Sequence, residues 1–232
     1  MIGERLVRTA ALLGEDALAR LATSHVLLLG LGGVGGHTLD ALVRTGVGAV
    51  TICDCDCFSE SNINRQLLAN SATVGRMKTE VALEHCRLLR DDVNITIHSE
   101  RVMPEEVGAL LESDRFDLVI DAVDDVAVKV AVAFEAKTRG IPILTCLGTG
   151  NRLDPTAFRF TDIARTTGCP LARRIRLRLR DLGVKHLRVL VSDELPHIPT
   201  VEGIRLGSVA YVTSVAGLML AAEAVRLLTA SE

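Results

Sequence analysis

The chain has 232 residues, of which 48% are hydrophobic and 24% are charged. This apolar content is enough for a substantial core and excludes a globally disordered protein. The net charge of −3 excludes a polycation, so any contact with nucleic acid must come from a local basic patch.

The N-terminal segment, MIGERLVRTAALLGEDAL, has charges spread through it and no continuous apolar stretch, so we expect no signal peptide. Six cysteines in such a chain are typical of free thiols in a reducing compartment rather than of a disulfide framework. We therefore expect a cytoplasmic protein.

The first third of the chain has the pattern of a βαβ unit. Apolar residues near helical spacing predict a helix over 4–23. The buried-strand pattern HVLLLG follows at 25–30, then a helix over 32–46 that ends at glycine, and then a second strand, AVTICD, at 49–54.

Strands and helices continue to alternate in the middle of the chain. A polar loop and a helix occupy 58–90, strands are expected at 94–99, 116–122 and 141–148, and a helix at about 127–139. We predict an α/β fold with a Rossmann-like, doubly wound and mainly parallel sheet.

The residue pattern changes after Gly150. We predict that residues 151–232 form an extended C-terminal part of the same domain as residues 1–150. It contains a short strand in DPTAFRF, a basic helix in ARRIRLRLRDLG, a strand in HLRVLVSDE that extends the sheet, and a last helix over about 208–229. Residues 206–222 contain no charge, but they are fewer than the roughly 20 that span a membrane and include serine and threonine. We expect a buried core or subunit-interface helix and no membrane insertion.

A glycine-rich loop, GLGGVG, lies where the first strand turns into a helix. Its glycines allow backbone N–H groups to approach phosphates, and the helix N-terminus adds partial positive charge. Asp54 ends the next strand, at the spacing from which a carboxylate reaches a ribose hydroxyl. The pattern predicts nucleotide binding and leaves NAD open; the loop glycines assigned to it are Gly30, Gly32, Gly33 and Gly35.

The stretch ICDCDCFSESNINRQ could hold either a metal or a nucleotide. On an extended chain Cys53, Cys55 and Cys57 would point one way and Asp54 and Asp56 the other. Zinc sites usually use C-x-x-C pairs, which the sequence lacks, and free cysteine behaves as a small buried hydrophobe. The acidic face is therefore the more informative one.

Donors for phosphate oxygens follow these acids. Asn62, Arg65 and Gln66 are close in sequence, and Lys78 stands alone at the start of a helix. The segment DAVDDV places Asp121 and Asp124 at the carboxyl end of a strand, where open α/β sheets bind ligands. Carboxylates beside phosphates favour Mg²⁺, so this set predicts phosphoryl or nucleotidyl transfer by positioning and charge neutralisation.

These motifs together resemble a known superfamily. The series GLGGVG, DCDCFSESNINRQ, VGRMK and DAVDD is similar, in the same order, to the ubiquitin-activating-type adenylating enzymes, over roughly residues 4–150. The second half, GTGNRLDPTAFRFTDIARTTGCPLARRIRLRLR, resembles the tRNA threonylcarbamoyladenosine dehydratases within that superfamily.

The resemblance implies ATP-dependent activation of the threonine carboxylate on a modified adenosine beside the tRNA anticodon, followed by ring closure. It implies that the glycine loop carries ATP, with Asp56 and Gln66 in the same site. By the same resemblance Asp54 would hold the ribose, Asn62, Arg65 and Lys78 the phosphates, and Asp124 the Mg²⁺. Superfamily members are homodimers whose N-terminal arginine enters the neighbouring site, and Arg8 stands at that position.

The sequence departs from the family pattern at three places. Position 169 is Cys where Asp is expected, the segment between Glu194 and Gly207 is shorter than in some relatives, and position 11 is Ala where relatives can carry a basic residue. The first departure lies just before the basic helix, where this chain has CPLA and the family pattern is DPLA. The second concerns a loop that could contact tRNA or a second subunit, and the third concerns the residues that act beside Arg8.

The basic helix concentrates positive charge in a mildly acidic protein, and we assign it to contact with the tRNA backbone. The residues assigned are Arg173, Arg174, Arg176 and Arg178. A solvated helix face that pairs with local acids is the structural alternative. Aromatic residues make up only 3% of the chain, so extensive stacking on unpaired bases is excluded.

Two other functions remain open. An enzyme that activates a sulfur-carrier protein would keep the ATP site and act with a sulfur-carrier or sulfur-transfer partner, but would usually show two C-x-x-C pairs. A non-catalytic nucleotide-binding regulator would not need Arg65 and Asp124. The complete charged set disfavours that reading.

Overall fold

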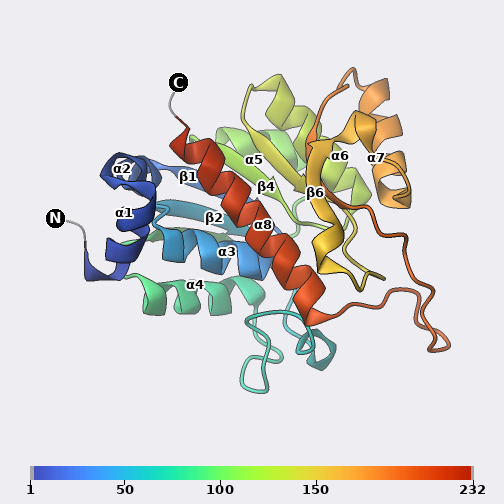
Figure 1. Ribbon diagram of the computed structural model, residues 1–232, viewed down its shortest axis with the longest axis horizontal. Coiled ribbons are helices and arrows are strands. Elements are labelled where there is room, and N and C mark those ends of the chain that lie inside the picture. Colours follow the sequence, from blue (N-terminus) through green and yellow to red (C-terminus); the bar gives the residue numbers. More distant parts are fainter. Residues whose placement is uncertain (1–2, 231–232) are drawn as a thin grey trace.

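A computed structural model describes residues 3–230. One sheet of seven strands, in the order β3-β2-β1-β4-β5-β7-β6, has helices on both faces (Figure 1). The strands are β1 (His25–Leu29), β2 (Ala49–Cys53), β3 (Asn94–His98), β4 (Leu118–Asp121), β5 (Ile143–Cys146), β6 (Phe158–Asp162) and β7 (Arg188–Ser192).

The helices follow the predicted alternation. They are α1 (Val7–Leu13), α2 (Glu15–Thr23), α3 (Gly35–Thr45), α4 (Lys78–Leu89), α5 (Val107–Glu112), α6 (Val126–Thr138), α7 (Pro170–Asp181) and α8 (Ala210–Thr229). Short 3-10 turns lie at Glu4–Leu6, Glu60–Asn62, Pro104–Glu106, Pro155–Ala157 and Ile163–Arg165. The fold class predicted from the sequence is confirmed.

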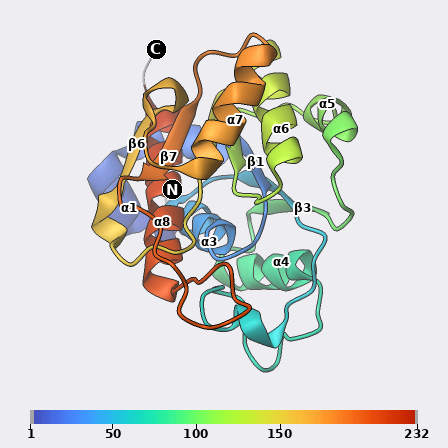
Figure 2. The ribbon, with the colours of Figure 1, turned by 90° about the vertical axis from the view of Figure 1, so that its right-hand side faces the viewer.

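Alternation along each central strand divides the core into two layers. On β1, Val26 and Leu28 face the core beneath α3, α4 and α8, whereas Leu27 and Leu29 face the core beneath α5, α6 and α7. Figure 2 shows α6 and α7 side by side on their face of the sheet. Because successive side chains of a strand point to opposite faces, uniformly apolar strands are what a sheet covered on both sides requires.

The C-terminal part extends the same sheet, as predicted. β7 pairs in parallel with β5, and β6 pairs antiparallel with β7 through the register Phe160 to Leu190. β6 thus forms the edge of the sheet, and all the other pairings are parallel.

Residues 4–23 are helical, as predicted, except for a break at Gly14. Gly14 adopts a φ of 88°, ends α1 and begins α2, so the segment forms two helices instead of one. The apolar spacing continues across the break and conceals it in the sequence. Helix α5, only six residues long, was not predicted at all.

Helix α8 packs closely on α3, which begins directly after the glycine loop. A Cβ atom on Gly217 would lie 2.4 Å from the Val34 carbonyl oxygen, so only glycine allows this approach. Thr38 Oγ1 donates a hydrogen bond to the Gly217 carbonyl at 3.0 Å, and Ser214 Oγ lies 2.8 Å from His37 Nε2. By length and composition alone α8 could cross a membrane, but its inner face belongs to the core, as the sequence predicts.

Candidate active site

The order of the strands creates a crevice at the carboxyl ends of β1 and β4. From β1 the chain proceeds outward to β2 and β3, and it then returns to place β4 on the other side of β1. Open α/β sheets bind ligands at such a switch point, because the loops after the two central strands diverge there. The glycine loop follows β1, and the acidic segment at 121–125 follows β4.

Two glycines of the loop are required by close backbone contacts. Gly30 has a φ of 90°, and a Cβ atom there would lie 2.7 Å from the Ala122 carbonyl oxygen. A Cβ atom on Gly35 would lie 1.8 Å from the Gly30 carbonyl oxygen. These contacts fold the loop tightly and bind it to the segment after β4, so that both walls of the crevice are fixed together.

Gly32 and Gly33 form the outer part of the loop. Nothing lies within 4 Å of a Cβ atom on Gly32, whereas one on Gly33 would lie 3.0 Å from Thr213 Oγ1 and 3.3 Å from Arg65 Cγ. Arg65 therefore lies against the glycine loop, as the prediction of a shared phosphate site requires. The contact of Thr213 was not predicted, and it brings the first turn of α8 to the same place.

Asp54 connects the loop to the segment after β2. Its Oδ2 accepts a hydrogen bond from Leu31 N–H at 2.7 Å, and its Oδ1 accepts one from Asp56 N–H at 2.9 Å. An ionised carboxylate has about four acceptor positions, so capacity remains for a ribose hydroxyl. The side chain is nearly buried, and its orientation is set by the glycine loop itself.

Lys78 begins α4 and lies between the two predicted acids. Its Nζ is 2.9 Å from Asp56 Oδ2 and 3.3 Å from Asp54 Oδ1, and only 5% of the residue is exposed. A buried ammonium requires such partners, because an unpaired charge away from water is costly. Lysine has three N–H donors, so one remains for a phosphate oxygen.

Arg65, Asn62 and Gln66 are placed by a short turn at Glu60–Asn62. Asn62 Oδ1 accepts from Ser59 N–H and caps the turn, and Arg65 Nη1 donates to the Ser61 carbonyl and to Asn64 Oδ1 at 2.9 Å each. Gln66 is buried, and its Oε1 has no hydrogen-bond partner among the residues that the structure describes. This orphaned buried atom marks a place where a ligand donor fits.

The acid that ends β4 and the two acids that follow it have different roles. Asp121 is fully buried and contacts Lys129 Nζ at 3.0 Å through both carboxylate oxygens. Asp125 caps α6 by accepting from Ala127 N–H at 2.7 Å. Asp124 is exposed and has no hydrogen bond or ion pair from the described part of the chain. Of the two acids that we predicted to face a ligand, only Asp124 is available; Asp121 is structural.

Lys129 is the charged residue that sequence reasoning missed. Besides both Asp121 oxygens it donates to the Cys146 carbonyl at 2.7 Å, so it connects the ends of β4 and β5. Burial raises the pKa of the Asp121 carboxyl, and the Lys129 ammonium opposes that shift. A single lysine in the apolar helix segment VAVKVAVAF was the available signal.

The cysteines do not form a metal cluster. Cys53 ends β2 and is buried, and burial raises the pKa of its thiol to about 12, which disfavours the thiolate that zinc requires. The strand ends at Cys53, but Asp54 and Asp56 still lie on one side of the chain, because both contact Lys78 Nζ; Cys55 is half-buried and Cys57 is exposed. Within residues 3–230, no group of three or more His, Cys, Asp or Glu side chains could hold a metal ion.

A Mg²⁺ ion that accompanies a nucleotide would not need such a cluster, because one or two carboxylates and the phosphates suffice. Asp124 fits this requirement, since it is exposed, directly follows Ala122 and Val123, which lie against Gly30, and has no ion pair among the described residues. The loop, the unpartnered Gln66 and the ammonium of Lys78 fit a nucleoside triphosphate in the same way.

Arg8 lies on α1, away from the crevice. Figure 1 shows α1 and α2 at the edge of the molecule where β1 begins, whereas the crevice lies where β1 ends. The Arg8 side chain is exposed. The structure therefore does not bring Arg8 to the other site residues of its own chain.

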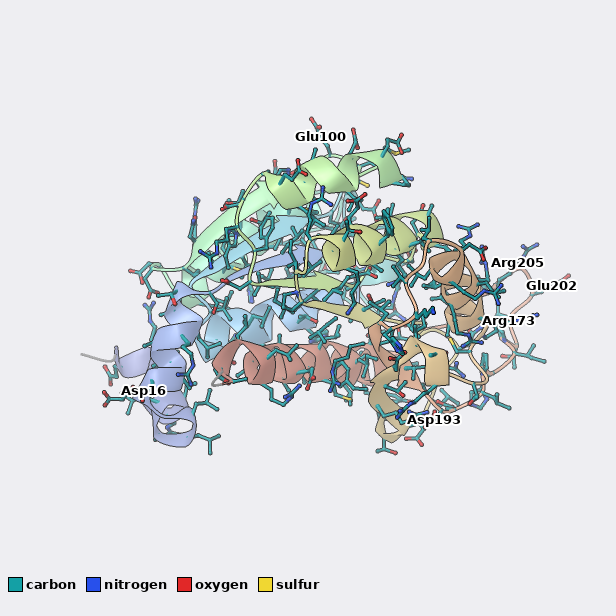
Figure 3. All side chains as sticks on the ribbon, turned by 90° about the horizontal axis from the view of Figure 1, so that it is seen from above. Asp16, Glu100, Arg173, Asp193, Glu202 and Arg205 are labelled. Carbon is teal, nitrogen blue, oxygen red and sulfur yellow. The ribbon has the colours of Figure 1, made fainter. Side chains whose placement is uncertain are left out.

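The basic residues of α7 have different environments. Arg173, Arg174 and Arg178 are exposed, and Figure 3 shows Arg173 at the end of the molecule opposite Asp16. Arg176 is half-buried, and its Nη1 donates to the carbonyls of Ile163 and Thr166 and to Thr166 Oγ1. Arg176 therefore fastens α7 to the turn before it.

Cys169 occupies the N-cap position of α7. Its Sγ accepts from Ala172 N–H at 3.5 Å, and the residue is buried. A thiol is a weak acceptor, so this cap is weaker than the carboxylate cap that the expected Asp would supply. The position is thus a helix cap in this chain.

Comparison with known proteins identifies the family of this chain. The ThiF family model matches residues 4–232. The chain belongs to the ThiF family.

Two relatives of this ThiF-family chain distinguish between the candidate functions. It is 39% identical over 182 residues to the tRNA threonylcarbamoyladenosine dehydratase of Escherichia coli, covering 78% of this chain and 68% of that one. It is 34% identical to the probable adenylyltransferase/sulfurtransferase MoeZ of Mycobacterium tuberculosis, covering 56% of this chain and 33% of that protein. The similarity to the dehydratase thus extends further along both chains.

The crystal structure of the E. coli dehydratase, TcdA, in complex with AMP is similar to this ThiF-family chain over nearly its whole length. The TM-score is 0.93 at 33% sequence identity, with 98% of this chain and 96% of that chain covered. The same protein in complex with ATP gives a TM-score of 0.91 at 32% identity, with the same coverage.

Proposed function

We propose that this chain catalyses the ATP-dependent dehydration of threonylcarbamoyladenosine in tRNA. The observation that carries the proposal is the combination of a nucleotide crevice with a similarity to the E. coli dehydratase that covers 98% of the chain and so includes its C-terminal part. The crevice supplies adenylation, and the second half distinguishes the acceptor from a sulfur-carrier protein.

Adenylation converts the carboxylate of the substrate into a better electrophile. A carboxylate oxygen attacks the α-phosphorus of ATP and pyrophosphate leaves. A nucleophilic atom within the same side chain then attacks the acyl carbon, the ring closes, and AMP leaves with the former carboxylate oxygen. The water that is lost overall is thus taken up in the conversion of ATP to AMP and pyrophosphate.

The residues of the crevice stabilise charge rather than transfer protons. Arg65 and Lys78 neutralise the developing charge on the phosphates, with Asn62 and Gln66 as neutral donors beside them. Asp54 and Asp56 orient Lys78, and Asp54 also holds the backbone of the glycine loop. Mg²⁺, held by Asp124 and the triphosphate, would supply further charge neutralisation.

The same proposal includes a homodimer in the cytoplasm. Arg8 belongs to α1, which lies where β1 begins, so in the proposed dimer it would serve the site of the second copy. Exposed apolar side chains on the same helix, Val7 and Leu12, support a subunit contact there, since Leu12 is 85% exposed. The exposed arginines of α7, Arg173, Arg174 and Arg178, would contact the tRNA backbone.

The proposal is tested by mass spectrometry of tRNA nucleosides. Incubation of threonylcarbamoyladenosine-containing tRNA with this protein, ATP and Mg²⁺ should convert that nucleoside into a product lighter by one water. Arg65→Ala and Asp124→Ala should each abolish the conversion and the release of pyrophosphate while the circular dichroism spectrum stays unchanged. Arg76→Ala, which removes an exposed arginine paired with Glu84, is the matched control and should stay active. An unmodified nucleoside profile with the active-site residues intact would refute the proposal.

A further inference from the structure

A second cavity lies beside the nucleotide crevice. It has a volume of about 280 Å³ and lies between the residues after β5 and the segment that leads into α8. The residues that line it are Asn151, Arg152, Leu153, His197, Ile198 and Pro199, with Thr200, Gly207, Ser208 and Val209 completing the wall. None of these residues was assigned individually to a site from the sequence, although His197 to Thr200 lie in the loop that we expected could contact tRNA or a second subunit.

The cavity adjoins the phosphate side of the crevice. Asn64 Nδ2 donates to the Ser208 carbonyl at 2.9 Å, and Asn64 Oδ1 accepts from Arg65 Nη1 at 2.9 Å. One asparagine therefore connects the wall of the cavity to the guanidinium that would hold the triphosphate. A molecule seated in the cavity can present a group to the nucleotide without crossing the domain.

Arg152 makes the cavity a candidate binding site. The residue is only 3% exposed and donates through Nη1 to the Glu194 carbonyl, but its buried Nε has no hydrogen-bond partner among the residues that the structure describes. No carboxylate of the described chain lies within 4 Å of its guanidinium. A buried cation without a carboxylate is costly, and an oxygen-bearing ligand in the cavity that Arg152 lines would lower that cost.

Asn151, the residue before Arg152, holds the segment before α8 against this part of the cavity wall. Asn151 has a φ of 58°, and it is the only non-glycine residue with positive φ in the described chain. Its Oδ1 accepts from Gly207 N–H at 2.6 Å, its Nδ2 donates to the Arg205 carbonyl, and its own carbonyl accepts from His197 N–H. Such strain is retained where the surroundings enforce it, and it is common at ligand sites.

The side chains that line the cavity indicate the chemistry of its ligand. Leu153, Ile198 and Val209 are apolar, whereas Arg152 offers a donor for an oxygen. The volume is just below the roughly 300–1,000 Å³ of sites that enclose whole small molecules, so one side group fits better than a complete nucleotide. An acyl side chain with a planar carbonyl group and a methyl group matches both kinds of surface.

We propose that this cavity binds the threonylcarbamoyl side chain of the modified adenosine, with Arg152 donating a hydrogen bond to an oxygen of that side chain. The inference rests on the proposed function, which supplies the substrate. The cavity lies next to Arg65, so a side chain held there has its carboxylate close to the phosphates. Arg152 positions the acceptor in the same way that Arg65 and Lys78 position ATP.

Binding of the free nucleoside tests the cavity without requiring turnover. Calorimetric titration of N6-threonylcarbamoyladenosine into the whole protein with AMP present should show binding, whereas adenosine, which lacks the side chain, should add none. Arg152→Met should weaken that binding at least about tenfold, because it removes a charge-assisted hydrogen bond. Arg205→Met is the matched control, since Arg205 is exposed on the same segment and does not line the cavity.

A second variant keeps the proposal testable if Arg152→Met does not fold. Ser208→Phe fills the cavity, leaves Arg152 in place, and should also abolish nucleoside binding while ATP affinity is kept. A wild-type protein that binds no modified nucleoside, or variants that bind it as the wild type does, would overturn the cavity assignment.

Turnover separates the cavity assignment from the proposed function. If the wild type binds the nucleoside but dehydrates no tRNA, the function fails and the cavity stands. If Arg152→Met dehydrates tRNA with unchanged KM and kcat, the cavity assignment fails and the function stands. If the proposed function and the cavity assignment are both correct, Arg152→Met should raise the KM for tRNA and leave the affinity for ATP unchanged.

Discussion

The crevice after β1 and β4 and the cavity after β5 and β7 are built in different ways. In the crevice, buried charges such as Lys78 and Lys129 are paired with carboxylates, and the backbone of the glycine loop touches the segment after β4. In the cavity, one wall is an exposed segment, with Ile198 89% exposed, and the buried guanidinium of Arg152 has no carboxylate. The buried charges Lys78 and Asp54 of the crevice are paired with each other, whereas the buried guanidinium of Arg152 has no carboxylate partner in the described chain.

This difference explains how one fold could activate different carboxylates. ATP needs the same contacts whatever the acceptor is, so the crevice can be rigid. The acceptor differs between enzymes that modify tRNA and enzymes that activate proteins, and in our proposal residues beyond Gly150 bind it; the similarity to the sulfurtransferase covers only 56% of the chain. Loops on a rigid scaffold can vary without loss of the core.

The largest expected effect is the loss of ATP binding when the glycine loop of the crevice is disrupted. Gly35→Ala places a Cβ atom 1.8 Å from the Gly30 carbonyl oxygen, so the loop must move, and we expect ATP binding to be abolished. Gly36→Ala is the control, because its Cβ atom would meet nothing closer than 3.9 Å. Equilibrium dialysis with labelled ATP measures both variants, and retained binding by Gly35→Ala would contradict the assigned role of the loop.

The next effect is on stability. Lys129→Met leaves the buried Asp121 carboxylate without its cation, which should cost about 3–5 kcal/mol in the free energy of unfolding. Urea denaturation measures this cost, and the double variant Asp121→Asn/Lys129→Met should recover a large part of it, because no unpaired charge remains.

The pH dependence of Lys129→Met gives a further check. Burial holds the pKa of Asp121 above its usual value in the folded protein. A group with a raised folded pKa stabilises the fold at low pH, and that stabilisation is lost as the pH rises through the folded pKa. The deficit of the variant should therefore be full at neutral pH and shrink as the pH falls toward about 4, where unfolded aspartate also takes up a proton. A deficit independent of pH would show that charge is not its cause.

The smallest effect concerns the basic helix. Arg173→Ala should weaken tRNA binding and lower the slope of log affinity against log salt by about one, as expected for one phosphate contact. Arg176→Ala should instead lower the melting temperature, because its Nη1 fastens α7 to Thr166. Filter binding at several salt concentrations and thermal unfolding distinguish the two residues. Equal salt slopes for wild type and Arg173→Ala would show that Arg173 does not contact a tRNA phosphate.

The sequence predicted the parts of the molecule that depend on local pattern. The strand HVLLLG, the glycine loop and the following helix are contiguous, and their apolar alternation and turn chemistry suffice to place them. The nearness of Arg65 to the loop was predicted from the motif order, and Gly33 confirms it.

The missed features depend on contacts between distant residues or on single backbone angles. The pairing of Lys129 with Asp121 and the Cys146 carbonyl, and the open donor of Arg152, arise only when several strands and loops come together. Helix α5 is too short for its periodicity to be recognised, and the break at Gly14 is a single residue within a continuous apolar pattern.

The contact between Gly217 and Val34 also has a consequence for synthesis of the protein. Residues 30–35 leave the ribosome well before α8, the helix that covers the start of α3. A nascent chain that ends before α8 exposes the apolar surface of α3 and lacks the backbone against which the phosphate loop packs. We therefore expect the nucleotide site to form only after α8 has been made, so that a nascent chain without α8 does not bind ATP.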